Sequence, residues 1–251
     1  GAYGYYLAAE EFSHLEKNNF KKELEKAADI LVNARPTAVN LSWALNIMHQ
    51  LTEENDDKKV EDIVELLYKK AGQIAEEDIK INKQMAKVGN EIVPEGAVIL
   101  THCNTGALAT VDYGTALGVI REAHFSGKNI EVFADETRPR LQGARLTAFE
   151  LVEEGIPSTL IADSVAATLI RDGKIDLILT GADRVAGNGD SANKIGTYML
   201  SEIANKFDIP FYIVAPLSTI DRDISSGDEI EIEERSDREV THIGDVQIAP
   251  D

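Results

Sequence analysis

One short segment of the chain holds residue types that carry covalent or acid–base chemistry. Residues 101–106 read Thr-His-Cys-Asn-Thr-Gly, and Cys103 is the only cysteine among 251 residues. A cysteine between a strand and a helix meets helix amide dipoles, which favour the thiolate. Such a thiolate is a nucleophile or a general base. A lone cysteine is also commonly a small buried apolar residue, and the composition alone leaves both interpretations open.

A second candidate is Asp183, in the segment Gly-Ala-Asp-Arg that begins at residue 181. The loop after it contains two glycines and an asparagine, which is typical of backbone that approaches a ligand closely. An aspartate in such a loop also commonly caps a turn. Asn193 and Lys194 follow and open a predicted helix. A helix start with an amide and a cationic side chain suits a phosphate or sugar hydroxyl groups.

A third group of polar side chains lies between residues 138 and 145, where three arginines surround Gln142. At least one arginine is expected to pair with a neighbouring acid at the surface. Gln142 lies in a predicted turn and is placed to orient a sugar hydroxyl group. Arg35, before a proline in the helical N-terminal part, is a further candidate that would point across a cleft toward these residues.

The sequence predicts neither a metal site nor a cofactor. His102 adjoins the cysteine, but neighbouring residues of a strand point to opposite faces, which disfavours a catalytic Cys–His pair. The other four histidines show no ligand spacing, and a single cysteine excludes a multi-cysteine zinc site. No GxGxxG segment follows a predicted strand, and no phosphate-binding P-loop occurs, so a dinucleotide or an ATP-type cofactor is not expected.

The elements that must position these residues change in character near residue 90. Apolar residues recur at three- and four-residue spacing in three successive regions, which predicts helices at 7–34, 34–51 and 58–89. Continuous apolar runs then predict strands at 97–102, 129–134, 158–162, 175–180 and 210–215, with helical stretches between them. Strands that alternate with helices are typical of a mostly parallel sheet covered on both faces.

We therefore predict an α/β protein with a helical N-terminal domain, residues 1–90, and a Rossmann-like domain, residues 91–251. Parallel strands present their carboxyl ends at one edge of the sheet, where ligands of open α/β sheets bind. Cys103 and Asp183 each follow such a strand and should meet at that edge. The residues alone thus indicate acid–base chemistry on a small anionic metabolite.

The composition narrows the class of partner. A net charge of -19 argues against nucleic acid, whose phosphates require Lys and Arg, but not against a small anion held by a local cationic patch. No apolar run approaches the length of a membrane span, and no signal-peptide pattern is present, so we expect a cytoplasmic protein without a membrane partner. The acidic segment 224–251 is expected to be a solvated surface segment.

Longer strings of the sequence resemble a known family. The segments ARPTAVNLSWALN, ILTHCNTGALAT, ETRPRLQGARLTAFEL and GADRVAGNGDSANKIGTY occur in the order found in methylthioribose-1-phosphate isomerases, and the likeness extends over nearly the whole chain. The wider family includes ribose-1,5-bisphosphate isomerases and the regulatory subunits of eukaryotic translation initiation factor 2B. The resemblance implies an aldose–ketose isomerase of methionine salvage, with a sugar phosphate substrate, no cofactor and a homodimeric assembly.

The resemblance also implies roles for individual residues. The family's catalytic cysteine falls on Cys103 and its proton-donating aspartate on Asp183. Substrate contacts fall on Arg35, Gln142, Asn193 and Lys194. Because the anomeric hydroxyl of the substrate is phosphorylated, ring opening needs a general acid, and a dry, apolar surrounding favours a protonated aspartate. Cys103 then removes the C2 proton to give an enediol, or it tunes the polarity of the site while a hydride moves; the sequence leaves both open.

Two alternative functions follow from the same resemblance. A ribose-1,5-bisphosphate isomerase would need a second cationic site, whereas an apolar pocket near Leu41 and Trp43 would favour a methylthio group. A non-catalytic regulatory subunit need not keep Cys103 and Asp183, and both are present here.

The family also has an upstream Arg-Gly-Ala stretch that holds phosphate, and it continues beyond the last residue. We therefore expect a chain that is truncated at both ends and binds substrate weakly or not at all.

Overall fold

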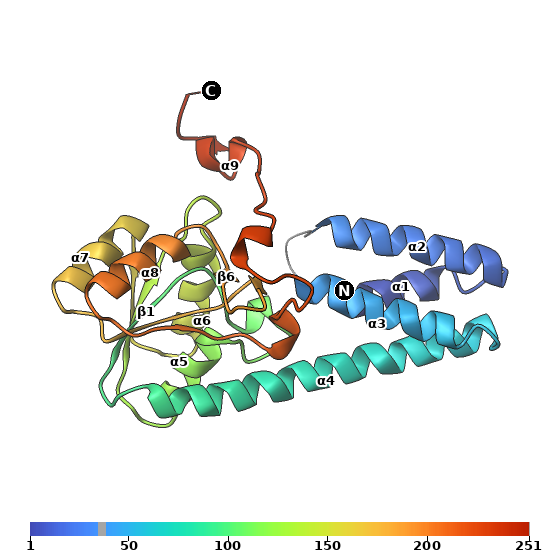
Figure 1. Ribbon diagram of the computed structural model, residues 1–251, viewed down its shortest axis with the longest axis horizontal. Coiled ribbons are helices and arrows are strands. Elements are labelled where there is room, and N and C mark those ends of the chain that lie inside the picture. Colours follow the sequence, from blue (N-terminus) through green and yellow to red (C-terminus); the bar gives the residue numbers. More distant parts are fainter. Residues whose placement is uncertain (35–38, 251) are drawn as a thin grey trace.

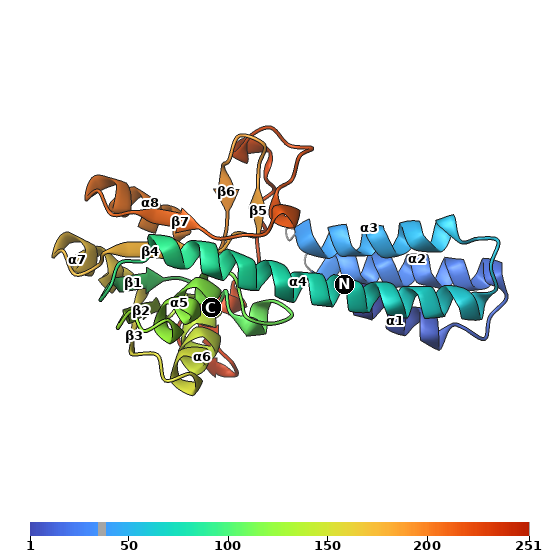
Figure 2. The same cartoon turned by 90° about the horizontal axis from the view of Figure 1, so that it is seen from below.

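The computed structural model describes residues 1–34 and 39–250, and it contains a bundle of helices beside a sheet covered by helices (Figure 1). The longest helix, α4 (Val60–Ile92), runs along both regions and joins them (Figure 2). The expected fold class, a helical N-terminal part followed by a Rossmann-like part, is confirmed.

The helical region consists of α1 (Ala2–Glu11), α2 (Lys17–Ala34), α3 (Val39–Glu54) and the first half of α4. The region predicted as one helix at 7–34 is two helices. Ser13 Oγ donates to the Glu10 carbonyl at 2.8 Å, and the His14 ring lies 3.1 Å from the Glu11 carbonyl oxygen. These side chains satisfy the last carbonyls of α1, and the chain turns there. The core of the bundle is apolar and includes Tyr5, Phe20, Leu24, Met48, Ile63 and Leu67.

The second half of α4 packs on α5 (Ala116–Phe125). The two helices approach so closely at Gly89 that a Cβ atom there would overlap the side chain of Val119. The helix therefore belongs to both regions, with Ile63 and Leu67 in the bundle and Gly89 against the α/β region. The division into residues 1–90 and 91–251 stays a prediction, and we propose the boundary at the end of this helix.

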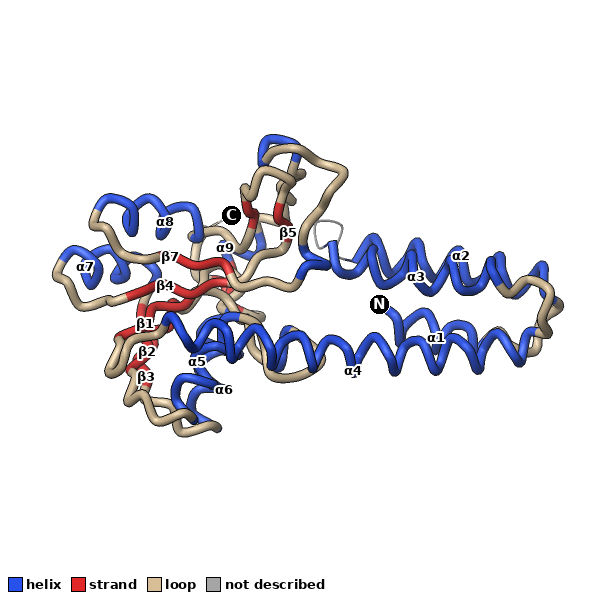
Figure 3. The backbone as a smooth tube through the Cα atoms, turned by 60° about the horizontal axis from the view of Figure 1, so that its bottom comes forward, coloured by secondary structure: helices blue, strands red, loops and turns tan. Residues whose placement is uncertain are grey.

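The sheet has five parallel strands in the order β3-β2-β1-β4-β7. They are β1 (Val98–Thr101), β2 (Glu131–Asp135), β3 (Ser158–Ile161), β4 (Leu177–Thr180) and β7 (Phe211–Ile213), each inside a predicted run or within one residue of it. Alternate residues face opposite sides: Ile99 and Leu179 pack toward α5, whereas Leu100 packs toward the other face. Figure 3 shows the strands as a central layer between helices.

One face of the sheet is covered by α5 and α6 (Ala148–Glu153), and the other by α7 (Ala166–Arg171) and α8 (Thr197–Lys206). The helix predicted to open at Asn193 and Lys194 begins later. Residues Ser191–Ala192 instead form β6, which pairs with β5 (Arg184–Val185) in an antiparallel hairpin. Gly196 then adopts a φ of 104°, a left-handed conformation that excludes helix at this point, so α8 begins at Thr197.

The acidic C-terminal segment contains α9 (Arg238–Thr241), β8 (His242–Ile243) and β9 (Val246–Gln247), and it extends away from the sheet (Figure 1). Two of the arginines considered above anchor it. Arg140 Nη1 lies 2.8 Å from Glu239 Oε1, and Arg138 Nη2 donates to the Val240 carbonyl at 2.7 Å. Over the described ranges, no helix is long and apolar enough to cross a membrane.

Candidate active site

Two neighbouring strands of the sheet, β1 and β4, carry the two principal candidates. The chain passes from β1 to β2 on one side, while β4 lies on the other side of β1. This reversal of direction creates a crevice at the carboxyl ends of β1 and β4, the place where open α/β sheets bind ligands. Cys103 follows β1 and Asp183 follows β4.

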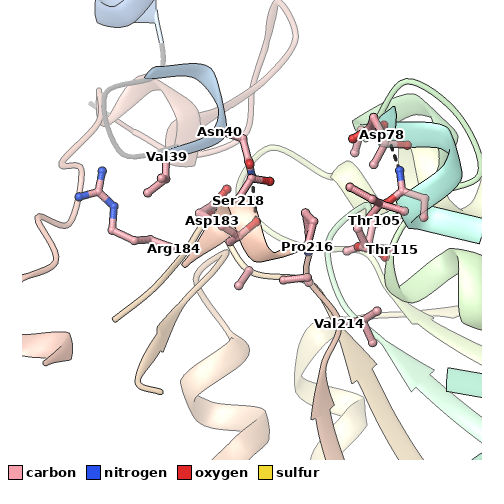
Figure 4. Close-up of a pocket in the computed structure, with 18 of the residues that line it drawn as sticks. Val39, Asn40, Asp78, Thr105, Thr115, Asp183, Arg184, Val214, Pro216 and Ser218 are labelled. Carbon is pink, nitrogen blue, oxygen red and sulfur yellow. Dashed lines mark hydrogen bonds between the residues drawn. The ribbon is translucent and has the colours of Figure 1, made fainter. Parts of the chain in front are cut away.

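A cleft of about 2080 Å³ lies over this edge of the sheet and extends to the helical region. Of the predicted site residues, Cys103, Gln142, Asp183, Asn193 and Lys194 all line it. Arg35 lies outside the described residues. Figure 4 shows Asp183 and Arg184 on one side of the cleft, with Asn40 from the helical region above them. The fold thus brings five of the six predicted residues to one cavity.

Cys103 adopts a left-handed backbone conformation, with a φ of 67°. This conformation costs a non-glycine residue about 1–2 kcal/mol, so the surrounding structure must hold it. The Cys103 amide donates to Thr137 Oγ1 at 2.9 Å, and its carbonyl accepts from Thr147 Oγ1 at 2.5 Å. The peptide groups around the half-buried thiol are thus fixed by the hydroxyls of Thr137 and Thr147.

A buried carboxylate supports the loop that follows the cysteine. Glu150 accepts from the Ala107 amide at 2.7 Å and from Asn104 Nδ2 at 2.9 Å. A Cβ atom on Gly106 would overlap this carboxylate, so the loop requires glycine at that position. Arg121 Nη2 lies 3.2 Å from Glu150 and also pairs with Glu154.

Burial alone would lower the pKa of Arg121, but its pairs with Glu154 and Glu150 outweigh this effect and raise it. Arg121 therefore stays charged beneath the loop. Neither Arg121 nor Glu150 was predicted from the sequence. The only signal was that Glu150 stands inside a string that carried the family resemblance.

The loop of Asp183 lies directly against the loop of the cysteine. A Cβ atom on Gly181 would come within 2.9 Å of Thr105 Cγ2, which shows how closely the two loops approach. The Asp183 amide donates to the Ala192 carbonyl at 2.8 Å, which fixes its backbone to the β5–β6 hairpin. Beside it, Arg184 Nη1 pairs with Asp221 Oδ2 at 3.1 Å.

The remaining predicted residues come from two further loops. Gln142 precedes a π-helical turn, Gly143–Thr147, and its Oε1 is buried without a hydrogen-bond partner among the described residues. Asn193 Nδ2 donates to Thr197 Oγ1 at 3.1 Å. Thr197 Oγ1 in turn donates to the Lys194 carbonyl at 2.8 Å. Asn193 and Lys194 therefore lie just before α8 and do not form its first turn.

The helical region forms the opposite wall. Asn40 Nδ2 donates to Thr219 Oγ1 at 2.8 Å, so α3 is joined to the loop after β7. On α4, Asp78 Oδ2 accepts from the Val111 amide at 3.0 Å. Several large apolar side chains face this cleft while remaining 38–61% exposed: Trp43, Ile81, Val88, Leu108 and Val111. The sequence predicted an apolar wall near Trp43 but not the contribution of α4.

One group of side chains in the described ranges has spacing that suits a metal ion: His102, Asp135 and Asp163, whose ligand atoms lie within 4.8 Å of one another. Hydrogen bonds already engage these atoms. The His102 ring contacts Asp135 and the Ile195 carbonyl. Asp163 accepts from the amides of Thr137 and Arg138, each at 2.7 Å. The cluster is therefore a hydrogen-bond network in which one atom, Asp135 Oδ1, is buried without a partner among the described residues.

The fold and the cleft are those of an α/β protein with a ligand site at the carboxyl ends of its strands, and comparison with known sequences identifies its family. The Initiation factor 2 subunit family matches residues 1–251, and the chain belongs to this family. Among its relatives is a methylthioribose-1-phosphate isomerase from Caldanaerobacter subterraneus subsp. tengcongensis, which is 65% identical over 250 residues, covering 100% of this chain and 72% of the relative. A methylthioribose-1-phosphate isomerase from Acetivibrio thermocellus is 53% identical, with 100% and 73% covered.

Solved structures agree with the sequence relatives. The 5-methylthioribose 1-phosphate isomerase from Pyrococcus horikoshii OT3 has a TM-score of 0.88 and 49% identity, covering 100% of this chain and 70% of that one. A protein from A. fulgidus named translation initiation factor eIF-2B, subunit delta, has a TM-score of 0.81 and 44% identity, covering 99% and 72%. The predicted resemblance to methylthioribose-1-phosphate isomerases is confirmed, and so is the predicted enzyme class of aldose–ketose isomerase.

Proposed function

We propose that this protein converts S-methyl-5-thioribose 1-phosphate to S-methyl-5-thioribulose 1-phosphate, the reaction for which its relatives are named. One observation carries the proposal: Cys103, Gln142, Asp183, Asn193 and Lys194 come from four separate loops and line one cleft. A relative at 65% identity is named methylthioribose-1-phosphate isomerase, which supports this assignment.

In the proposed mechanism, Asp183 is the general acid. It gives its proton to the ring oxygen of the sugar while the bond between that oxygen and C1 breaks. A hydrogen then moves from C2 to C1, and the C2 hydroxyl becomes the carbonyl of the ketose as its proton passes back to the carboxylate of Asp183. A proton transfer by a well-placed side chain contributes about 10²- to 10⁴-fold to a reaction rate. Arg35, Gln142, Asn193 and Lys194 are the proposed substrate contacts.

Cys103 has one of two roles in the hydrogen transfer. As a base, it removes the C2 proton to give an enediol, and that proton exchanges with water. As a thiol that tunes polarity, it leaves the hydrogen to move directly as a hydride. Substrate with deuterium at C2 separates the two routes, since full retention of deuterium in the product indicates hydride transfer and its loss to water indicates the enediol.

The wall of the cleft supports a methylthio substrate. The apolar side chains of Trp43, Ile81, Val88 and Leu108 are exposed to the cleft and would bury a CH₃S group. A second phosphate in that place would instead require cationic partners. This wall favours methylthioribose 1-phosphate over ribose 1,5-bisphosphate.

The test is an assay of ketose 1-phosphate formation by the full-length protein, with methylthioribose 1-phosphate and ribose 1,5-bisphosphate as rival substrates. We expect turnover of the first substrate, lost in both Cys103→Ser and Asp183→Asn. Asp172→Asn, at an exposed ion pair with Arg171, is the matched control and should keep full activity. Turnover of ribose 1,5-bisphosphate alone would replace the proposed substrate. Absence of turnover by the folded protein would indicate a regulatory subunit.

We also propose that the protein is a homodimer that associates through its α/β region. The strand β3 is at the edge of the sheet, and large apolar side chains near it are exposed, among them Phe149, Val152 and Leu160. Apolar exposure next to a sheet edge is typical of an interface. Light scattering after size exclusion should give twice the mass of the chain, and Val152→Asp should reduce it to one chain. A monomeric wild-type protein would contradict this proposal.

A further inference from the structure

The imidazole of His102 is held at both nitrogens inside the α/β region. The side chain follows β1 and is 1% exposed. Its Nδ1 lies 2.8 Å from Asp135 Oδ2, and its Nε2 lies 2.8 Å from the Ile195 carbonyl oxygen. A carbonyl oxygen only accepts hydrogen bonds, so Nε2 carries a proton. The ring therefore bridges the end of β2 and the segment that precedes α8.

The segment before α8 is fitted against this ring. A Cβ atom on Gly196 would lie 2.8 Å from both Cε1 and Nε2 of His102. Gly196 also has a φ of 104°, which other residues rarely adopt. Backbone and ring are thus in direct contact, with no room for a side chain between them. Asn193 and Lys194 stand two to three residues before this contact and line the cleft.

The same strand end fixes the cysteine. Thr137 Oγ1 accepts from the Cys103 amide at 2.9 Å and donates to the Asp135 carbonyl at 3.2 Å. Thr137 itself has a φ of 63°, and its amide donates to Asp163 Oδ1 at 2.7 Å. Asp135 therefore connects the two parts of the site. Its carbonyl accepts from Thr137, which binds the Cys103 amide. Its carboxylate contacts His102, which in turn contacts the segment that carries Asn193 and Lys194.

We propose that the buried His102–Asp135 pair is a positioning unit that fixes the segment carrying Asn193 and Lys194 relative to Cys103. Neither side chain lines the cleft, so the pair acts through the groups that it holds. A displacement of about 1 Å in a site of this kind costs about 10²-fold in rate. The inference rests on the proposed function for its substrate, but the effect of the His102–Asp135 pair on the loop is independent of any substrate.

Three variants separate position from charge. Gly196→Ala keeps the pair but forces the segment away from the ring. Asp135→Asn keeps both hydrogen bonds of His102, since the Asn amide donates to Nδ1 of a neutral ring while Nε2 still donates to Ile195. His102→Leu removes the bridge altogether. Gly173→Ala is the matched control for Gly196, because Gly173 has a φ of 66° and open space around it. His49→Gln, at an exposed histidine outside the cleft, is the control for His102.

The measurements are kcat and KM for methylthioribose 1-phosphate and hydrogen exchange of the amides at 193–197. We expect Gly196→Ala and His102→Leu to lose about 10²-fold in kcat/KM and to exchange faster at 193–197. Asp135→Asn should stay within about threefold of the wild type, and both controls should match it. Because Gly196→Ala retains the buried pair, it keeps the test valid if His102→Leu does not fold.

Two results would overturn the proposal. A folded Gly196→Ala protein with wild-type kcat/KM and wild-type exchange at 193–197 would show that the contact positions nothing. An Asp135→Asn protein as impaired as Gly196→Ala, with exchange unchanged, would show that charge and not position matters. If the wild-type protein does not turn over the substrate, the proposed function fails, while the exchange measurement still decides whether the pair orders the loop.

Discussion

The helical region and the α/β region bury different kinds of side chain. The bundle is held by apolar residues such as Phe20 and Leu67. The α/β region buries His102 against Asp135 and Arg121 against Glu150 beneath the loops that line the cleft. Loops expose amides and carbonyls that apolar contacts cannot satisfy, so polar side chains must hold them. The difference indicates that the bundle supplies stability and a wall, whereas the buried polar groups set the geometry of the site.

The largest expected effect is on stability alone. Leu67 is fully buried in α4 within the bundle, and Leu67→Ala should lower the free energy of unfolding by about 2–5 kcal/mol. Because Leu67 does not line the cleft, kcat/KM should be unchanged at temperatures where the variant is folded. Denaturant unfolding and steady-state kinetics check both, with the exposed Leu7→Ala as the control. Loss of activity in the folded variant would show that the core of the bundle also sets the geometry of the site.

A change beneath the loop of the cysteine should affect stability and activity together. Glu150→Gln replaces the carboxylate that accepts from the Ala107 and Leu108 amides and faces Arg121. We expect a loss of about 1–3 kcal/mol in stability, because buried donors lose a charged acceptor. We also expect kcat/KM to fall at least tenfold. Glu153→Gln, exposed on the same helix, should change neither, and a fully active Glu150→Gln would contradict the role of the network.

The apolar wall should affect substrate binding more than the fold. Trp43→Ala removes a side chain that is 40% exposed and lines the cleft. We expect KM for methylthioribose 1-phosphate to rise about tenfold, because the loss of an apolar contact worth about 1.4 kcal/mol weakens binding by that factor. Phe125→Ala, an exposed aromatic outside the cleft, is the control. An unchanged KM would show that Trp43 of the helical region does not contact the substrate.

The smallest expected effect is a pH dependence of stability. Burial lowers the pKa of His102, but the hydrogen bond and charge of Asp135 raise it more, so the pKa lies above its ordinary value of 6.5. Burial raises the pKa of Asp135, against the effect of His102. The folded chain therefore binds the proton between His102 and Asp135 more tightly than the unfolded chain does. The resulting stabilisation of the folded chain is complete below about pH 6.5, the pKa of this histidine in the unfolded chain.

The stabilisation should disappear as the pH rises through the raised pKa of His102. Thermal unfolding between about pH 6 and pH 9 should show the wild type losing stability relative to Asp135→Asn, whose ring stays neutral. A constant difference in melting temperature between the two proteins across this range would show that the pair holds no such proton.

The sequence predicted the sheet and the edge at which the site lies, because runs such as 97–102 and 175–180 are continuous and apolar on both faces. The family strings predicted which residues line the cleft. The His102–Asp135 pair was not foreseen, since its members are 33 residues apart and meet only through the register of β1 and β2. The late start of α8 was also missed, because helix periodicity does not report that Gly196 contacts His102.

We propose that Asp183 and Cys103 act from one cleft on a methylthio sugar phosphate. The most direct test is the rate of ketose 1-phosphate formation from methylthioribose 1-phosphate by the wild-type protein and by Asp183→Asn, with melting temperatures measured in parallel. We expect turnover by the wild type and a loss of about 10²- to 10⁴-fold in the variant at an unchanged melting temperature. A folded wild type without turnover, or an Asp183→Asn variant as fast as the wild type, would contradict it.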